Sequence, residues 1–196
     1  VIDYAHSQSR SALMDVYLIG ECRFYLGSST SLLETAFLLN KPMLIANQIQ
    51  WINSMPCRHG DITVFRHVYS KVENRFLSLQ EWLLRATDIT AEWSSPDWQF
   101  FENSNEEIAS AVKEMMDPSR KKEPTYLQKE FRKAHTDAVQ KLSKTFRFDP
   151  DEPENCNEWF RVASILLAWR GNISAEFLEK NWIKSSKTTL PPSVDS

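Results

Sequence analysis

The sequence has few cysteines and no long apolar run, and both absences limit what the protein can be. Its 196 residues include three cysteines, which are far apart in the chain and form no CxxC pair: Cys22, Cys57 and Cys156. Their odd number and wide spacing favour reduced thiols in a cytoplasmic protein over a disulfide framework or a zinc site. The longest apolar run, about Val162–Trp169, is well short of the ~18 residues that a membrane-spanning helix needs. The first residues do not have the pattern of a signal peptide either.

A strong charge of one sign is also missing. The formal net charge is −3 at pH 7, which gives no general attraction to nucleic acid or to an anionic membrane. Hydrophobic residues make up 42% of the chain, enough for one sizeable core or a core with an appendage. We therefore expect a globular protein that neither binds nucleic acid nor spans a membrane.

The chain also lacks an initial methionine. It begins with Val1, and the segment VIDYAHSQSRS has the composition of a strand end that enters a loop. No strand–helix repeat precedes this segment. We expect that the piece is cut from a longer protein, or from a longer domain.

The segment 22–47 has the most informative pattern. The aromatic and apolar residues at 23–26 predict a strand that ends in the small-residue turn Gly27–Ser29. A helix is predicted from Thr30–Ser31 onward; Asn40 is suited to its left-handed stop, and Pro42 prevents its continuation. The apolar run Met43–Ala46 predicts a second strand buried on both faces, as parallel strands are. A strand that leads through a small-residue turn into a helix is where α/β proteins bind phosphate.

Helices and short strands are predicted along the rest of the chain. Capping boxes at Ser78/Glu81 and Ser104/Glu107 predict helices over 79–84 and up to Met116. Apolar spacing predicts further helices at 11–21, 125–144, 158–170 and 174–181, and a short strand or an extended segment at 62–69. The predicted fold class is α/β, a Rossmann-like parallel sheet followed by an α-helical extension. The predicted domains are 1–118 (sheet and helices), 119–183 (helical extension) and 184–196 (a disordered polar tail).

The turn at 27–31 is the candidate binding site. If Ser29 is the N-cap, Thr30 and Ser31 lie in the first helical turn, with free backbone N–H groups and hydroxyls near any bound anion. Glu34 shares their helix face, where its carboxylate suits the vicinal hydroxyls of a ribose. The alternative is an ordinary capped helix with Glu34 as a solvated surface residue. Spacing alone does not decide between the two.

The same stretch resembles a known family. It is similar to the C-terminal nucleotide-sugar-binding domain of GT-B fold glycosyltransferases, and most similar to a bacterial group of such enzymes. The matching residues are Asp3, Tyr4, Ala5, Ser7, Arg10, Ser11, Asp15, Tyr17, Leu18, Cys22–Phe24, Gly27–Ser29, Pro42 and Asn47. The segments 75–81 and 103–108 also match, so that the resemblance covers about residues 1–116. The sequence departs from the family at Thr30, where a glycine is usual, and at Arg66, where a lysine is usual.

The resemblance implies a donor-binding role. It implies that Gly27, Ser28, Ser29, Thr30 and Ser31 contact the diphosphate of a nucleotide-sugar. It implies that Glu34 binds the ribose, that Arg10 offsets the diphosphate charge, and that Asn47 lies at the ligand-binding edge of the sheet. The donor is a substrate, and no bound metal or other cofactor is implied. Catalysis would rest on electrostatic support of the departing diphosphate and on positioning.

The acceptor and the catalytic base belong to the other domain in such enzymes. The resemblance therefore identifies no catalytic residue in this chain, and we expect the piece to bind a nucleoside diphosphate and to transfer nothing alone. Two other functions remain open. One is a nucleotide-sugar epimerase or hydrolase of the same architecture. The other is a non-catalytic nucleotide-binding or scaffold module that uses the helical back half.

Overall fold

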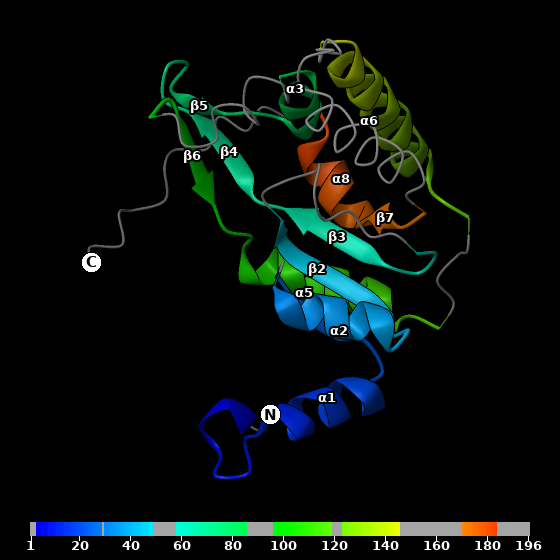
Figure 1. Cartoon of the computed structure of the whole chain (residues 1–196). Coiled ribbons are helices and arrows are strands. Elements are labelled where there is room, and N and C mark those ends of the chain that lie inside the picture. The colour runs from blue at the N-terminus through cyan, green and yellow to red at the C-terminus, as the bar shows by residue number, and fades with distance from the viewer. Residues whose placement is uncertain are drawn as a thin grey trace, which may run out of the picture.

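A computed structural model of the chain describes residues 3–28, 30–48, 58–85, 96–118, 123–145 and 170–183. Within these residues the protein is α/β, with a four-stranded parallel sheet and helices on both of its faces (Figure 1). The strand order is β1 (Tyr25–Gly27), β2 (Met43–Gln48), β3 (Ile62–Phe65) and β7 (Asn172–Ile173). This arrangement is consistent with the predicted Rossmann-like fold.

The central strand β2 is buried on both faces because its side chains alternate between two hydrophobic clusters. Leu44 and Ala46 belong to the larger cluster, which includes Val64 of β3 and Ile173 of β7. Met43 and Ile45 belong to the smaller cluster on the other face. Parallel strands covered by helices on both sides have this near-continuous apolar sequence.

The larger cluster is covered by three helices from the second half of the chain. They are α5 (Asn105–Met116), α6 (Tyr126–Thr145) and α8 (Ala175–Asn181). Ala111, Phe131 and Leu178 are fully buried contributions of these three helices. The described residues of the predicted helical extension (119–183), namely 123–145 and 170–183, therefore share the sheet's core and also supply its fourth strand.

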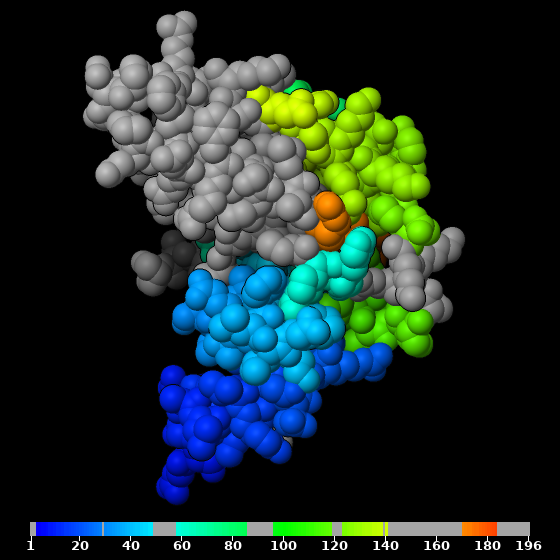
Figure 2. Space-filling view, turned by 45° about the vertical axis from the view of Figure 1, so that its right-hand side comes forward, coloured from blue at the N-terminus to red at the C-terminus, as the bar shows by residue number. Residues whose placement is uncertain are grey.

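The smaller cluster is covered by α2 (Ser31–Leu38), with Ala36 completely buried. The helix α1 (Ala12–Glu21) packs on α2 and contributes Ile19. Much of α1 is exposed, with 81% of Leu13 and 59% of Tyr17 accessible to solvent. In Figure 2, this N-terminal part, drawn in dark blue, projects from the rest of the molecule. No helix in the described ranges is both long and apolar enough to cross a bilayer.

A second, antiparallel sheet lies next to the first and was not predicted. Its order is β5 (Arg75–Phe76), β4 (His67–Ser70) and β6 (Trp98–Phe101). β4 follows β3 after the single residue Arg66, so the chain passes directly from one sheet to the other (Figure 1). The extended segment predicted at 62–69 therefore consists of two strands.

Most of the predicted helices are confirmed where the structure describes them. α1 begins after its cap Ser11, and α3 (Leu79–Leu84) and α5 both have the predicted capping boxes. Asn40 ends α2 with a φ of 55°, as predicted for a left-handed stop. α6 and α8 lie within a residue of their predicted bounds. The helix predicted at 158–170 and the tail at 184–196 fall almost entirely outside the described residues.

Candidate functional site

Three strands of the parallel sheet, β1, β2 and β3, end at its carboxyl edge. Gly27 is in register with Ile45, and Gln48 is in register with Phe65. The residues that follow these positions, Ser28 and Arg66, therefore lie at one edge of the sheet, with Asn47 of β2 between them. Open α/β sheets bind their ligands at this edge.

The N-terminus of α2 lies at this edge and has no side-chain cap. The helix begins at Ser31, as predicted, but its N-cap is Thr30 and not Ser29. Four consecutive hydroxyl residues, at 28–31, have nearly the same capping preference, so the sequence did not distinguish them. Ser29 itself lies outside the described residues. The Thr30 side chain makes no capping hydrogen bond, and the backbone N–H groups of Ser31 and Leu32 have no partner within the described part of the chain.

At the N-terminus of each of the other described α-helices, a side chain accepts a hydrogen bond from a backbone N–H of the first turn. Ser11, Ser78 and Ser104 each accept a bond from the third residue of the helix that follows. Thr125 accepts from Gln128 N at 3.3 Å before α6. At α8, Ala175 N donates to the Glu114 carboxylate at 2.9 Å. The α2 N-terminus therefore differs from these five in lacking a side-chain acceptor; its third amide, Leu33 N, donates to Thr30 O at 2.9 Å instead.

The side chain of Tyr25 partly covers the same bend. A Cβ on Gly27 would lie 2.4 Å from Tyr25 Oη, so the phenol ring rests against the Gly27 backbone. The hydroxyl of Tyr25 is 3.4 Å from Thr30 Oγ1. The absence of a side chain at Gly27 thus makes room for this ring. A ligand at the bend would contact the Tyr25 hydroxyl.

Of the two charged residues predicted to act with the bend, Glu34 lies near it and Arg10 does not. Glu34 is exposed in the first turn of α2, directly below the bend. Arg10 is exposed before α1, the helix that rests on α2 and not on the sheet, and no described contact of Arg10 joins it to the bend. The structure therefore brings Glu34 close to the bend and leaves Arg10 apart from it.

Asn47 is held by a reciprocal pair of bonds with Asn103. Asn47 N donates to Asn103 Oδ1 at 2.9 Å, and Asn103 N donates to Asn47 Oδ1 at 2.7 Å. Asn103 Nδ2 also donates to Phe65 O at 2.6 Å. These bonds tie the ends of β2 and β3 to the residue before the α5 cap, so Asn47 has a structural role at the predicted edge.

Arg66 supplies positive charge at the same edge. Its backbone N donates to Gln48 O at 3.0 Å, and its Nη2 donates to Glu102 at 3.0 Å. The Arg66 Nε is buried and has no hydrogen-bond partner among the described residues. Glu102 is 69% exposed, so this ion pair contributes little to stability and its arginine can be shared with another anion.

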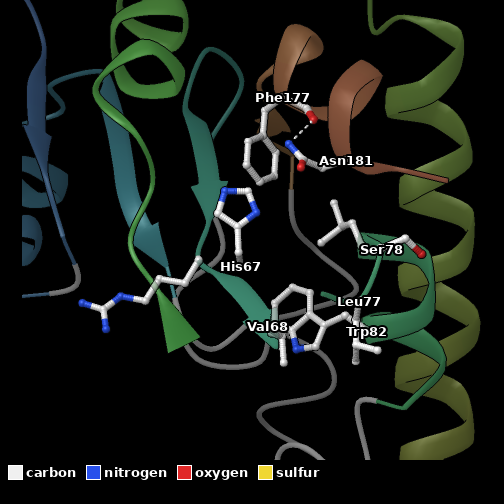
Figure 3. A pocket seen from close by; sticks show the side chains of 9 residues that line it. His67, Val68, Leu77, Ser78, Trp82, Phe177 and Asn181 are labelled. Carbon is white, nitrogen blue, oxygen red and sulfur yellow. Dashed lines mark hydrogen bonds between the residues drawn. The ribbon is translucent and has the colours of Figure 1, made fainter. Parts of the chain in front are cut away.

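A pocket beyond the end of β3 was missed by the sequence analysis. We call it the His67 pocket; it is a small hollow of about 20 Å³, partly open to solvent and large enough for about one water molecule. Figure 3 shows His67 at its centre, with Phe177 and Asn181 on one side and Trp82 on the other. It is lined by Arg66, His67, Val68, Leu77, Ser78, Leu79, Trp82, Phe177 and Asn181. These residues come from β4, α3 and α8 and from the segments that join them, so no local sequence pattern unites them.

Glu107 of α5 holds the ring of His67 in the pocket. Its Oε2 accepts bonds from His67 Nε2 at 2.9 Å and from Ser104 N at 3.0 Å, and its Oε1 accepts from Asn181 Nδ2 at 3.3 Å. Burial alone would raise the pKa of Glu107, but the bonds from these neighbours outweigh burial and lower its pKa. The sequence analysis assigned Glu107 only to a capping box, a role that the structure confirms.

Among the described residues, no group of three or more His, Cys, Asp or Glu side chains is placed to hold a metal ion. Comparisons with protein-family models, with curated proteins and with solved structures give no match to this chain.

Proposed function

We propose that this chain binds the diphosphate group of a nucleotide-sugar at the Ser28–Ser31 bend, as the donor-binding part of a glycosyltransferase of the GT-B type. The observation that carries the proposal is the open N-terminus of α2 at the carboxyl edge of a parallel sheet. Free N–H groups and the helix dipole both favour an anion there. The resemblance of residues 1–116 to nucleotide-sugar-binding domains points to the same segment.

Glu34 and Arg66 support a nucleotide over a simple phosphate ion at this edge of the sheet. Glu34 is exposed one turn along α2, where its carboxylate can accept hydrogen bonds from ribose hydroxyls. Arg66 lies at the same edge and can offset part of the diphosphate charge. In enzymes of this kind another domain provides the acceptor site and the catalytic base. We therefore expect binding without transfer by this chain alone.

Isothermal titration of the chain with uridine, guanosine and adenosine diphosphates tests the proposal. We expect at least one nucleotide to bind, and Thr30→Asp to weaken that binding at least tenfold. An aspartate at the N-cap would satisfy the free N–H groups and place a negative charge where the diphosphate binds. Ser11→Asp is the matched control, because it adds the same charge at a helix that is already capped.

Glu34→Ala tests the ribose contact separately. It should weaken nucleotide binding and leave pyrophosphate binding unchanged or stronger, because pyrophosphate has no ribose. Equal nucleotide affinities for the wild type and Glu34→Ala would remove Glu34 from the site. No binding of any of the three nucleotides, or equal effects of Thr30→Asp and Ser11→Asp, would contradict the proposal.

A further inference from the structure

We propose that the protein forms a symmetric dimer through α1, in which the α1 helices of two copies pack antiparallel to one another. The inference goes beyond nucleotide binding and does not depend on it. It rests on three features of α1: an exposed apolar face, the match of that face to itself, and opposite charges at its two ends.

The outer face of α1 carries an apolar stripe. Leu13, Tyr17 and Leu18 are exposed and Met14 is partly exposed. Because residues three and four apart share a helix face, these four side chains lie together, and we call them the α1 stripe. Ile19 is on the opposite side of the helix and is buried against α2. A helix of ten residues is only marginally stable by itself, so a partner on its outer face would stabilise it.

The apolar surface continues from α1 onto the end of α2. Most of the exposed large apolar side chains among the described residues lie between positions 13 and 39. Leu39 lies against α1, since a Cβ at Gly20 would be 3.9 Å from its Cδ1, and the adjoining Leu38 is 81% exposed. Figure 2 shows that this N-terminal part projects from the molecule, so a second copy can reach it. Exposed apolar surface of this kind marks an interaction site.

The α1 stripe matches itself when a second copy is turned end over end. An antiparallel pair can place Leu13 of one copy opposite Leu18 of the other, and in the same alignment Met14 lies opposite Tyr17. A two-fold axis then makes each of these contacts occur twice, as in any interface that uses the same surface on both subunits. Every residue of the stripe thus has an apolar partner within the same stripe.

The charges at the two ends of α1 favour this antiparallel pair. Arg10 lies just before the cap of α1, and Glu21 is its last residue. Both are exposed, and neither has an ion pair in the described part of the chain. The same alignment brings Arg10 of each copy to Glu21 of the other, whereas a parallel pair would bring like charges together. Charge complementarity therefore supports a second copy as the partner and determines its orientation.

A membrane surface suits the α1 stripe less well. Helices that lie on membranes carry Lys and Arg on their polar face, which attract anionic lipids. α1 contains no Lys or Arg, and its two charged residues, Asp15 and Glu21, are both acidic. An anionic bilayer would repel them, whereas a second copy supplies Arg10 for each Glu21.

The size of the surface indicates a weak dimer. The ten residues of α1 form a helix about 15 Å long. Each partner of a standard interface buries about 800 Å², more than one face of so short a helix provides. We therefore expect a dissociation constant of about 10–300 µM, typical of a transient interface.

Sedimentation velocity of the chain between about 1 µM and 1 mM tests the proposal. We expect the sedimentation coefficient to rise with concentration towards that of a dimer. Leu13→Glu and Tyr17→Glu should each weaken dimerisation about tenfold, because they place a carboxylate in the α1 stripe. Leu84→Glu is the matched control: Leu84 is also a helix leucine, 70% exposed, but it belongs to α3, so its change should leave the dimer intact. Circular dichroism checks that each variant is folded.

Charge reversal tests the antiparallel orientation. Arg10→Glu and Glu21→Arg should each weaken the dimer about tenfold, because both symmetric ion pairs become pairs of like charge. The double variant Arg10→Glu/Glu21→Arg should regain the wild-type dissociation constant, because the pairs form again with their charges exchanged.

Four results would overturn the proposal. One is a wild type that is still monomeric at about 1 mM. The second is a dimer that Leu13→Glu and Tyr17→Glu do not weaken, and the third is a double variant of Arg10 and Glu21 that does not regain the affinity. The fourth is a monomeric wild type that binds vesicles of phosphatidylcholine and phosphatidylglycerol and loses this binding in Leu13→Glu, which would assign the α1 stripe to a membrane.

Discussion

The phenol ring of Tyr25 rests on the backbone of Gly27, two residues further along the same strand. A Cβ at Gly27 would lie within 3 Å of three atoms of that ring. The bend at the carboxyl end of β1 therefore has its shape because residue 27 has no side chain. This relationship links the packing of the smaller hydrophobic cluster, to which Tyr25 belongs, to the proposed anion site.

Replacing Gly27 with alanine should displace the Tyr25 ring. We expect the free energy of unfolding to fall by about 1 kcal/mol, the low end of the cost of overpacking, because the new methyl group meets the outer end of a half-buried ring. Gly20→Ala is the control, because a Cβ there meets only Leu39 Cδ1 at 3.9 Å inside the helix α1. That change should stabilise the protein by about 0.5–1 kcal/mol. Urea denaturation of both variants measures the difference, and equal stabilities would contradict the placement of the ring.

The sequence predicted those helix starts and stops that are determined by residues close together in the chain. Asn40 and Pro42 end α2, and the capping boxes at Ser78 and Ser104 begin α3 and α5, because each acts within four residues. The antiparallel sheet was missed for two reasons. β6 pairs with β4 over a long distance in sequence, as His67 does with Phe101, and β5, although local, has only two residues. The His67–Glu107 contact spans 40 residues and has no local signature. β7 has only two residues and follows from pairing with β3.

The paired bonds of Asn47 and Asn103 should matter for stability. Asn47 has a φ of 55°, which alanine tolerates poorly and glycine accepts. We expect both Asn47→Ala and Asn47→Gly to lose about 1–3 kcal/mol because Asn103 N is left unpaired. Alanine should cost a further ~1–2 kcal/mol for its backbone conformation. Chemical denaturation of the wild type and both variants measures the free energies of unfolding, which should decrease from wild type to Asn47→Gly to Asn47→Ala. An unchanged free energy for Asn47→Gly would show that the Asn47–Asn103 bonds do not stabilise the protein.

Arg58 should be a specific requirement for the turn between α2 and β2. Its guanidinium donates to Phe37 O, Asn40 Oδ1 and Lys41 O, and pairs with the buried Asp61. Lysine cannot reproduce this planar set of donors. We expect Arg58→Lys to lower the free energy of unfolding by about 1–3 kcal/mol, since carbonyl groups and Asp61 lose their partners. Arg10→Lys is the control, because Arg10 is exposed, and it should leave the thermal midpoint unchanged. An unchanged midpoint for Arg58→Lys as well would show that the Arg58 bonds do not stabilise the turn.

The Arg75–Glu81 pair should make stability depend on pH in acid. Bonds from the Arg75 guanidinium, with help from the Ser78 cap, lower the pKa of Glu81 to about 2 from an ordinary value of 4.5. Because the pKa of Glu81 is lower in the folded than in the unfolded protein, its ionised form stabilises the fold at pH values above 4.5. This stabilisation is lost as the pH falls from 4.5 towards 2. Glu81→Gln should therefore reduce the acid dependence of the thermal midpoint in that range.

Glu176→Gln provides the comparison for the acid prediction. Glu176 pairs with Lys180 on the exposed surface of α8, where solvent screens the interaction. Its removal should alter the slope between pH 4.5 and 2 less than the removal of Glu81. Parallel curves for the wild type and Glu81→Gln would show that the Arg75 pair does not stabilise the folded state.

The most direct test of the central claim is the chemical shift of the Ser31 and Leu32 backbone amides during a titration with pyrophosphate. The account predicts that both amides move progressively, that the movement saturates, and that Thr30→Asp suppresses it while Ser11→Asp does not. If these two amides stay in place while others in the protein respond, the diphosphate binds elsewhere and the bend at the end of β1 is not a donor site.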